Sequence, residues 1–282
     1  MGWMLPVLLT ALLLWFSDSA MHCALAAAQV FVSGVMPALF PMMVLSRMLP
    51  CRPGAGERRT FLQAAAFACL SGSPASAQRA AALPLSRPAL EKLLCASGLM
   101  SPLFFTGTLE RWCRSSGMGL RLLAAHWLSA WLTALLWRPA PAGEPAAPAA
   151  DAQPRPALTQ AISQSASALL GVCGAMMLFS ILAGILAQAL GLILPRWTQE
   201  HAHWMAVLWA MMEIGGGAKA VIDSFPSPPG ALLCALCSFG GLSVWLQNLL
   251  FLGEKIHPAK LLCMRALHGA LAYAIFSLLS FL

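Results

Sequence analysis

The segment W-M-A-V-L-W-A-M-M-E-I-G-G-G-A-K-A-V-I-D (204–223) contains two short apolar stretches separated by one carboxylate and three glycines. Neither stretch reaches the roughly 20 residues that an α-helix needs to cross a bilayer. The segment T-F-L-Q-A-A-A-F-A-C-L-S-G-S-P-A-S-A-Q-R-A (60–80) is divided in the same way at S-G-S-P. Two half-length helices around a break of small residues predict a re-entrant helical hairpin near 60–86 and a second one near 202–226.

The composition is that of a membrane protein. Of the 282 residues, 59% are hydrophobic and 10% are charged, whereas a soluble domain has about 45–50% and about 25%. The mean hydropathy is +0.75. Such a chain has too few polar residues to cover the surface of a soluble globule. The composition therefore excludes a disordered chain, a small disulfide scaffold and a water-soluble enzyme, and it predicts an all-α integral membrane protein.

The remaining apolar segments divide the chain into four parts. We predict an N-terminal transmembrane helix in residues 1–20, a first repeat in 21–137, a Pro/Ala-rich linker in 138–156 and a second repeat in 157–282. Residues 1–20 also have the apolar core and small-residue end of a signal peptide, but no Lys or Arg precedes the core. Cleavage of this stretch therefore stays open.

Short matches recur in the two halves at nearly the same spacing. The matching residues are Gly34 with Gly171, Ala77 with Ala218, Leu93 with Leu232, and His126 with His268. The last pair is 142 residues apart (268 − 126 = 142), close to half of the 282 residues. Each half also has a hairpin, then a broken helix, then a full span. The first half crosses the membrane three times, so the second half begins on the opposite side and is inverted relative to the first. We therefore predict two inverted repeats, each with a re-entrant helical hairpin and a broken transmembrane helix.

The distribution of basic residues predicts the topology. The chain has 17 Lys and Arg against 10 Asp and Glu, and with seven predicted crossings most of the basic residues fall on one side. That side holds Arg47, Arg52, Arg58, Arg59, Arg87, Lys92, Arg138, Arg155, Lys255 and Lys260, and the other holds Arg111, Arg114, Arg121 and Arg196. The positive-inside rule then places the N-terminus in the cytoplasm and the C-terminus outside a bacterial cytoplasmic membrane. No basic run carries interleaved aromatics, so we expect no nucleic-acid partner.

Polar and small residues at the two breaks and in the broken helices are the candidate substrate-binding residues. Backbone that leaves a helix inside lipid must be satisfied by protein, substrate or cavity water, and freed helix N-termini attract anions. The candidates are Ser71, Gly72, Ser73, Ser76, Gln78, Ser101, Thr106, Glu213, Gly215, Gly216, Lys219, Ser238, Ser243, Gln247 and Asn248. Small residues also pack helices together, and buried amides also bond one helix to another, so these structural alternatives stay open.

Four charged residues lie in or beside the breaks: Arg79, Glu213, Lys219 and Asp223. An ionic group inside a bilayer is costly, so it usually pairs or faces water. Glu213 and Lys219 flank the three glycines, and a hairpin tip is expected to bring them together. Their role is then to bind substrate or a coupling ion, or to form a structural pair at an exposed tip. Arg79 and Asp223 are expected to reach the headgroups.

Several motifs occur in an order that resembles one known family. They are G-V-M-P-A-L-F-P-M-M-V-L-S (34–46), S-G-S-P-A-S-A-Q (71–78), S-P-L-F-F-T-G-T (101–108), L-F-S-I-L (178–182), M-E-I-G-G-G (212–217) and S-F-G-G-L-S-V-W-L-Q (238–247). Together they resemble the sporulation integral membrane protein family YlbJ, also called SpoVV, of the nucleoside-recognition Gate superfamily. This superfamily is related to concentrative nucleoside transporters. The resemblance implies two inverted repeats and transport of a small polar solute, which in spore-forming members is dipicolinate crossing the outer forespore membrane.

The leading hypothesis is a secondary transporter or permease that moves a dipicolinate-like anion or a nucleoside-like solute across a bacterial membrane. The alternative is a membrane-embedded sporulation, maturation or assembly factor that transports nothing. No nucleophile–base set or catalytic motif is found, so we expect no enzyme. No cofactor is predicted, while coupling to Na⁺ or H⁺ and the formation of a homo-oligomer stay open. The nine scattered cysteines predict no disulfide framework.

Overall fold

The computed structural model describes residues 3–49, 56–139 and 156–281, and every regular element in these ranges is a helix. Within these ranges, five helices are long and apolar enough to cross a membrane. They are Ser17–Met48, Met118–Leu136, Leu158–Ile193, Gly230–Lys255 and Pro258–Leu279. The structure thus confirms the all-α fold class expected for a membrane protein. Most of the predicted linker, residues 140–155, lies outside the described residues.

The N-terminal part differs from the single helix predicted in residues 1–20. α1 (Met4–Trp15) has 12 residues, and at about 1.5 Å per residue it is too short to cross the hydrocarbon core. It is followed by α2 (Ser17–Val30), the π-helical segment η1 (Phe31–Val35) and α3 (Met36–Met48). These last three elements are continuous and form the first helix of spanning length.

The first half continues with two interruptions. Its elements are α4 (Glu57–Ser71), α5 (Ala75–Ala81), α6 (Arg87–Ser97), the π-helical η2 (Phe104–Leu109), α7 (Glu110–Cys113) and α8 (Met118–Leu136). The helix α4 ends at Ser71, as the S-G-S-P sequence predicts, and α5 packs against it. The backbone is again non-helical over residues 98–101. The interruptions therefore fall at both positions expected from the sequence.

The second half has the same pattern of interruptions. Its elements are α9 (Leu158–Ile193), α10 (Pro195–Glu200), α11 (Ala202–Met212), α12 (Ile214–Ser224), α13 (Gly230–Phe239), α14 (Gly241–Leu252), the 3₁₀ segment η3 (Gly253–Lys255) and α15 (Pro258–Leu279). The helix α11 ends before Glu213 and packs against α12, while Gly240 separates α13 from α14. With 36 residues, α9 is about 54 Å long and exceeds the bilayer core.

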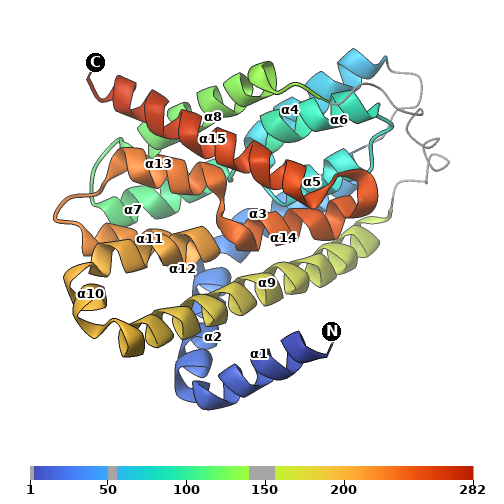
Figure 1. Ribbon diagram of the computed structural model, residues 1–282. Helices are drawn as coiled ribbons and strands as arrows, with labels where there is room; N and C mark the ends of the chain where they lie inside the picture. Colours follow the sequence, from blue (N-terminus) through green and yellow to red (C-terminus); the bar gives the residue numbers. More distant parts are fainter. Residues whose placement is uncertain (1–2, 50–55, 140–155, 282) are drawn as a thin grey trace.

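Most of the short helices lie between the long helices α8 and α15 on one side and the long helix α9 on the other (Figure 1). Figure 1 shows α8, α13 and α15 along one side of the molecule and the long α9 along the other. The helix α15 packs against α13 and α8, and α9 packs against α2, α3 and α14. Because α11 contacts α9, α13 and α14, it bridges the two sides. Buried apolar side chains fill the spaces between these helices in three clusters.

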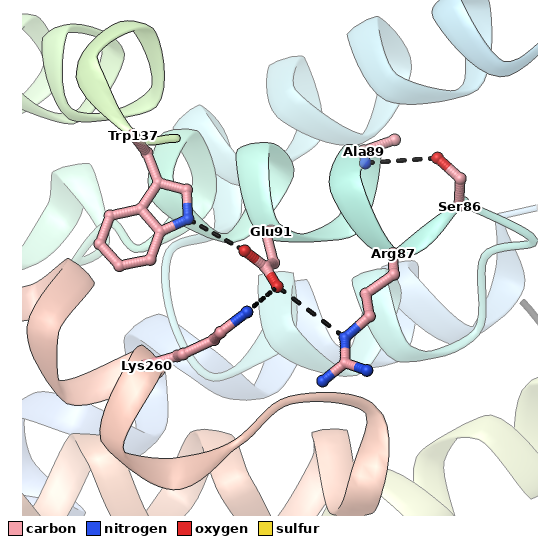
Figure 2. A network of polar contacts seen from close by, with 6 residues as sticks. All are labelled: Ser86, Arg87, Ala89, Glu91, Trp137 and Lys260. Atoms are coloured by element: carbon pink, nitrogen blue, oxygen red, sulfur yellow. Dashed lines mark hydrogen bonds and ion pairs between the residues drawn. The ribbon is translucent and has the colours of Figure 1, made fainter. Parts of the chain in front are cut away.

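A buried carboxylate ties three helix ends together at one end of the molecule (Figure 2). Glu91 of α6 is 2% exposed, pairs with Lys260 of α15 at 2.8 Å and lies 3.9 Å from Arg87. Its other oxygen accepts a 3.1 Å hydrogen bond from the indole N–H of Trp137, just after α8. Ser86 caps the start of the same helix α6. Since Glu91 and Lys260 come from different halves of the chain, this network joins the two halves.

Candidate functional site

A buried cavity lies where the interrupted helices of both halves meet. Its volume is about 50 Å³, and its walls come from η1, α3, α9, α14, η2 and the breaks. The predicted binding residues that line it are Ser73, Ser101, Glu213, Gly215 and Gln247. They belong to the two breaks and the two broken helices. The structure therefore brings together residues that are far apart in the sequence and that the sequence singled out separately.

The first break is bonded to the first broken helix and to the second half. The N–H of Ser73 donates to the carbonyl of Leu99 at 2.5 Å, and the hydroxyl of Ser76 donates to the carbonyl of Ser97 at 2.9 Å. The hydroxyl of Ser73 also donates to Oδ1 of Asn248 in α14 at 2.5 Å. Polar backbone atoms that the interruption of the helix releases thus find partners within the protein, as the apolar surroundings require.

In each half, a glycine without a side chain allows the break and the broken helix to approach each other closely. Gly72 has φ +69° and ψ 178°, and a Cβ there would lie 2.3 Å from the nitrogen of Ser101. Gly241, with φ +72°, begins α14, and a Cβ there would lie 3.1 Å from the carbonyl oxygen of Ala210 and 3.2 Å from that of Met212. Positive φ and this close approach both favour glycine. The same contact between a break and a broken helix therefore occurs twice.

Glu213 is the charged residue at the cavity. Its side chain is 1% exposed, and its two oxygens accept N–H bonds of 2.7 Å each from Gly215 and Gly216. It is the N-cap of α12, where the helix dipole favours a negative charge. A carboxylate has about four lone-pair sites, so two bonds leave acceptor capacity at the cavity for a solute N–H, a solute hydroxyl or a cation.

Both π-helical segments reach this cavity. Gly34 and Val35 of η1 line it, as does Phe104 of η2, and the two segments contact each other. A π-helical turn inside an α-helix is rare and is frequently found at functional sites. The sequence predictions include Gly34, Ser101 and Thr106 in or near these segments but no π-helical turns, because nothing in an apolar sequence distinguishes a π-helical turn from an α-helical one.

The other predicted binding residues do not line the cavity. The hydroxyl of Thr106 is exposed and donates to the carbonyl of Pro102 at 3.1 Å. Gln78 lies beside Arg47, which donates to its amide oxygen when that oxygen faces the guanidinium group. Ser238 contacts His126 at 2.7 Å. The remaining predicted residues outside the cavity lining are Ser71, Gly72, Ser76, Gly216, Lys219, Ser243 and Asn248.

The predicted pairing of Glu213 with Lys219 is wrong. Lys219 pairs with Asp223 instead, and the two side chains are 43% and 57% exposed. The reason is helical geometry: α12 begins directly after Glu213, so residues 213 and 219 lie on different faces, whereas 219 and 223 are neighbours at i and i+4. The buried carboxylate at the cavity is therefore separate from the exposed ion pair.

We expect Lys219→Ala to change the free energy of unfolding by no more than about 0.5 kcal/mol, because an exposed ion pair within one helix contributes little. The measurement is unfolding of the purified protein by titration with a denaturing detergent. Asp223→Ala is the matched variant, since it removes the same pair from the other side. A loss of several kcal/mol in either variant would contradict the exposed position of this pair.

Arg265, which the sequence predictions omit, is a buried cation between the two broken helices. It is 2% exposed, and its Nε donates to the carbonyl of Phe239 at 3.0 Å. Its Nη1 donates to the carbonyl of Gly98. These carbonyls lie at the C-terminal ends of α13 and α6, where the helix dipole favours a cation. A single Arg within the apolar segment 261–282 was the available signal, since a charge inside a span needs a partner.

Two histidines hold the same region together. His126 of α8 and His268 of α15 are fully buried, with ring centroids 4.8 Å apart. Because Nε2 of His126 accepts from the N–H of Met100 at 2.9 Å, a neutral His126 carries its proton on Nδ1 and donates to Ser238 at 2.7 Å. Nε2 of His268 in turn donates to the carbonyl of His126 at 3.0 Å. The matched histidines thus connect both full spans to the broken helices.

Five apolar helices of spanning length, packed with shorter helices around a cavity that a few polar residues line, define the chain as an α-helical membrane protein. When it is compared with models of protein families, with curated proteins and with solved structures, the chain matches none of them. Its function is therefore argued from the cavity and the groups around it.

Proposed function

We propose that the chain is a secondary transporter or permease for a small polar organic solute, either a dipicolinate-like anion or a nucleoside-like molecule. The observation that carries this proposal is the buried cavity at which both breaks and both broken helices meet. Helices that are interrupted inside a membrane are tolerated where the freed backbone faces protein or a cavity, and they form the substrate sites of many secondary transporters. Ser73, Ser101, Glu213 and Gln247 supply the polar groups of this site.

The proposal includes two inverted repeats with re-entrant hairpins. The order of a short helix pair, a broken helix and a full helix occurs once as α4–α5, α6–η2 and α8, and again as α11–α12, α13–α14 and α15. The two carbonyls that Arg265 binds belong to Gly98 and Phe239, which are 141 residues apart (239 − 98 = 141). This spacing equals half of the 282 residues and supports a repeat of that length.

The orientation follows from the basic residues at one end of the bundle. Arg87, Lys92 and Lys260 lie around the ends of α6, α8 and α15. Lys255 bonds the carbonyl of Ala81 nearby in the fold, at the end of α5. This grouping supports the cytoplasmic assignment of that end by the positive-inside rule. The protein would then lie in the bacterial cytoplasmic membrane or, in a spore former, in the outer forespore membrane.

The size of the cavity implies movement during transport. Its 50 Å³ accommodates a few water molecules, whereas pockets for organic ligands measure about 300–1,000 Å³. A solute can enter only when the breaks separate from the broken helices. The hydrogen bonds of Ser73 to Leu99 and to Asn248 are two that such an opening would break.

The test is uptake of radiolabelled dipicolinate and, separately, of radiolabelled uridine by vesicles that contain only the purified full-length chain. We expect uptake of one of them, and we expect Glu213→Gln to lower it at least about tenfold, because a charge-assisted hydrogen bond contributes about 1.5–3 kcal/mol. Glu200→Gln is the matched control, since this glutamate is on the short helix α10 and outside the cavity lining.

The outcomes separate the two functions considered. Uptake that is lost in Glu213→Gln and kept in Glu200→Gln supports a transporter with its site at the cavity. Uptake that both variants retain would place the site elsewhere. A folded wild-type protein that moves neither solute would contradict the proposal and favour the membrane-embedded assembly or maturation factor.

A further inference from the structure

A second site lies on the outer surface, away from the buried cavity. A groove of about 690 Å³ runs between the helices α4, α6 and α8. We call it the α4–α8 groove; it is lined by Glu57, Arg58, Phe61, Leu62, Ala89, Lys92, Trp131, Ala134 and Leu135. Apolar side chains on the outside of a membrane protein face lipid in any case, so the distinguishing feature is the charge at one end of this groove.

Two cations lie at that end. Arg58 is exposed, and within the described ranges no hydrogen bond or ion pair is found for its guanidinium group. Nζ of Lys92 donates to the carbonyls of Ala134 and Leu135 at 2.6 and 3.3 Å, which leaves one of its three N–H donors available. Glu57 is the carboxylate of the groove, and one of its oxygens accepts the backbone N–H of Ser86 at 2.7 Å. The formal charges of Glu57, Arg58 and Lys92 sum to +1, and the guanidinium group of Arg58 lies on the wall of the groove.

The position of the cations matches the depth of lipid headgroups. Lys92 bonds the last carbonyls of α8, which is one of the helices of spanning length, so it lies where a span ends. Arg58 lies in the first turn of α4, and the apolar Phe61 and Leu62 follow in the next turn. A cation at the end of a span followed by an apolar surface along the helix fits a phosphate and the acyl chains below it.

We propose that the α4–α8 groove binds an anionic phospholipid, with its phosphate at Arg58 and Lys92 and its acyl chains along Phe61, Leu62 and Trp131. Trp131 is 41% exposed and Leu62 is 52% exposed, so both present apolar area to a bound chain. The site does not depend on transport, because it lies on the outer surface and shares no residue with the cavity lining.

The experiment measures binding of phosphatidylglycerol and of phosphatidylcholine with identical chains to the purified full-length protein by native mass spectrometry. We expect the wild type to favour phosphatidylglycerol, and Arg58→Gln to weaken it about fivefold, since one cation near a membrane surface contributes about 1 kcal/mol. Binding of phosphatidylcholine should stay unchanged. Arg59→Gln is the matched control, because Arg59 is the next residue and does not line the groove.

Each other outcome would overturn the proposal. Equal binding of the two lipids would show that the groove does not select anionic lipids and is an ordinary part of the lipid-facing surface. Equal weakening by Arg58→Gln and Arg59→Gln would indicate a general effect of net charge. Displacement of phosphatidylglycerol by millimolar inorganic phosphate would indicate a small-anion site that does not need the acyl chains. Unfolding temperatures of both variants that match the wild type verify that the substitutions leave the fold intact.

Discussion

Gly72→Ala should lower the free energy of unfolding by about 3 kcal/mol or more, from strain in a backbone region that is nearly restricted to glycine and from a steric clash. Gly72 has φ +69° and ψ 178°, and its added Cβ would lie 2.3 Å from the nitrogen and 2.7 Å from the Cα of Ser101. The atoms nearest to this Cβ belong to the backbone of Met100 and Ser101, so no side-chain rotation can relieve the contact. The first break and the first broken helix would have to separate.

The measurement is unfolding in a denaturing detergent, followed by the reaction of a thiol dye with buried cysteines, among them Cys95, Cys234 and Cys237. Gly117→Ala is a control for a positive φ without a steric clash, because Gly117 has φ +78° and open space around its Cβ position. It should cost about 1–2 kcal/mol. Equal losses in the two variants would show that the contact between the first break and Ser101 is not tight.

The positions of the breaks could be predicted because they depend on local sequence. An apolar helix cannot continue through Ser71-Gly72-Ser73-Pro74, and Glu213 followed by glycines favours a helix start over a helix interior. The same reasoning located Ser73 and Ser101, and Gln247 was noted as a polar amide within an apolar run; all three line one cavity. Their convergence was expected from the repeat and did not follow from any of these segments alone.

The ion-pair partner of Lys219 was wrongly predicted, because it depends on which face of a helix a residue occupies. Glu213 and Lys219 are close in sequence, but the start of α12 directly after Glu213 rotates Lys219 toward Asp223. The N-terminal helix is a different case. The apolar run near residues 5–16 ends close to the end of α1 at Trp15, but with 12 residues α1 is shorter than the transmembrane helix predicted in residues 1–20.

The role of Arg265 could not be predicted from the composition of the chain or from the periodicity of its apolar residues. In an apolar span, one Arg looks like an exception to a pattern, and its partners are backbone carbonyls that no side-chain motif reveals. Those carbonyls exist as free acceptors only because α6 and α13 end inside the protein. The ends of the interrupted helices need hydrogen-bond donors for their carbonyls, and the buried cation needs acceptors. Each therefore compensates the cost of burying the other.

Arg265→Met should consequently lower the free energy of unfolding by about 2–4 kcal/mol. Each hydrogen bond from a charged donor contributes about 1.5–3 kcal/mol, and relief from burying the cation offsets part of the loss of two. Methionine keeps most of the length of the side chain, so the cavity that it leaves is small. The carbonyls of Gly98 and Phe239 would lose their Arg265 donor and would hold α6 and α13 less firmly.

Two further variants test this prediction: Arg265→Lys, which keeps the charge, and Arg121→Met, which is the control at an exposed arginine. Lysine keeps the charge but presents its donors from one nitrogen, whereas arginine uses Nε for Phe239 and Nη1 for Gly98, so we expect an intermediate loss. Arg121 is exposed on α8, and its replacement should change stability by less than about 0.5 kcal/mol. If Arg265→Met and Arg121→Met unfold alike, the helix ends are held by His126 and by packing, and Arg265 is not the residue that joins them.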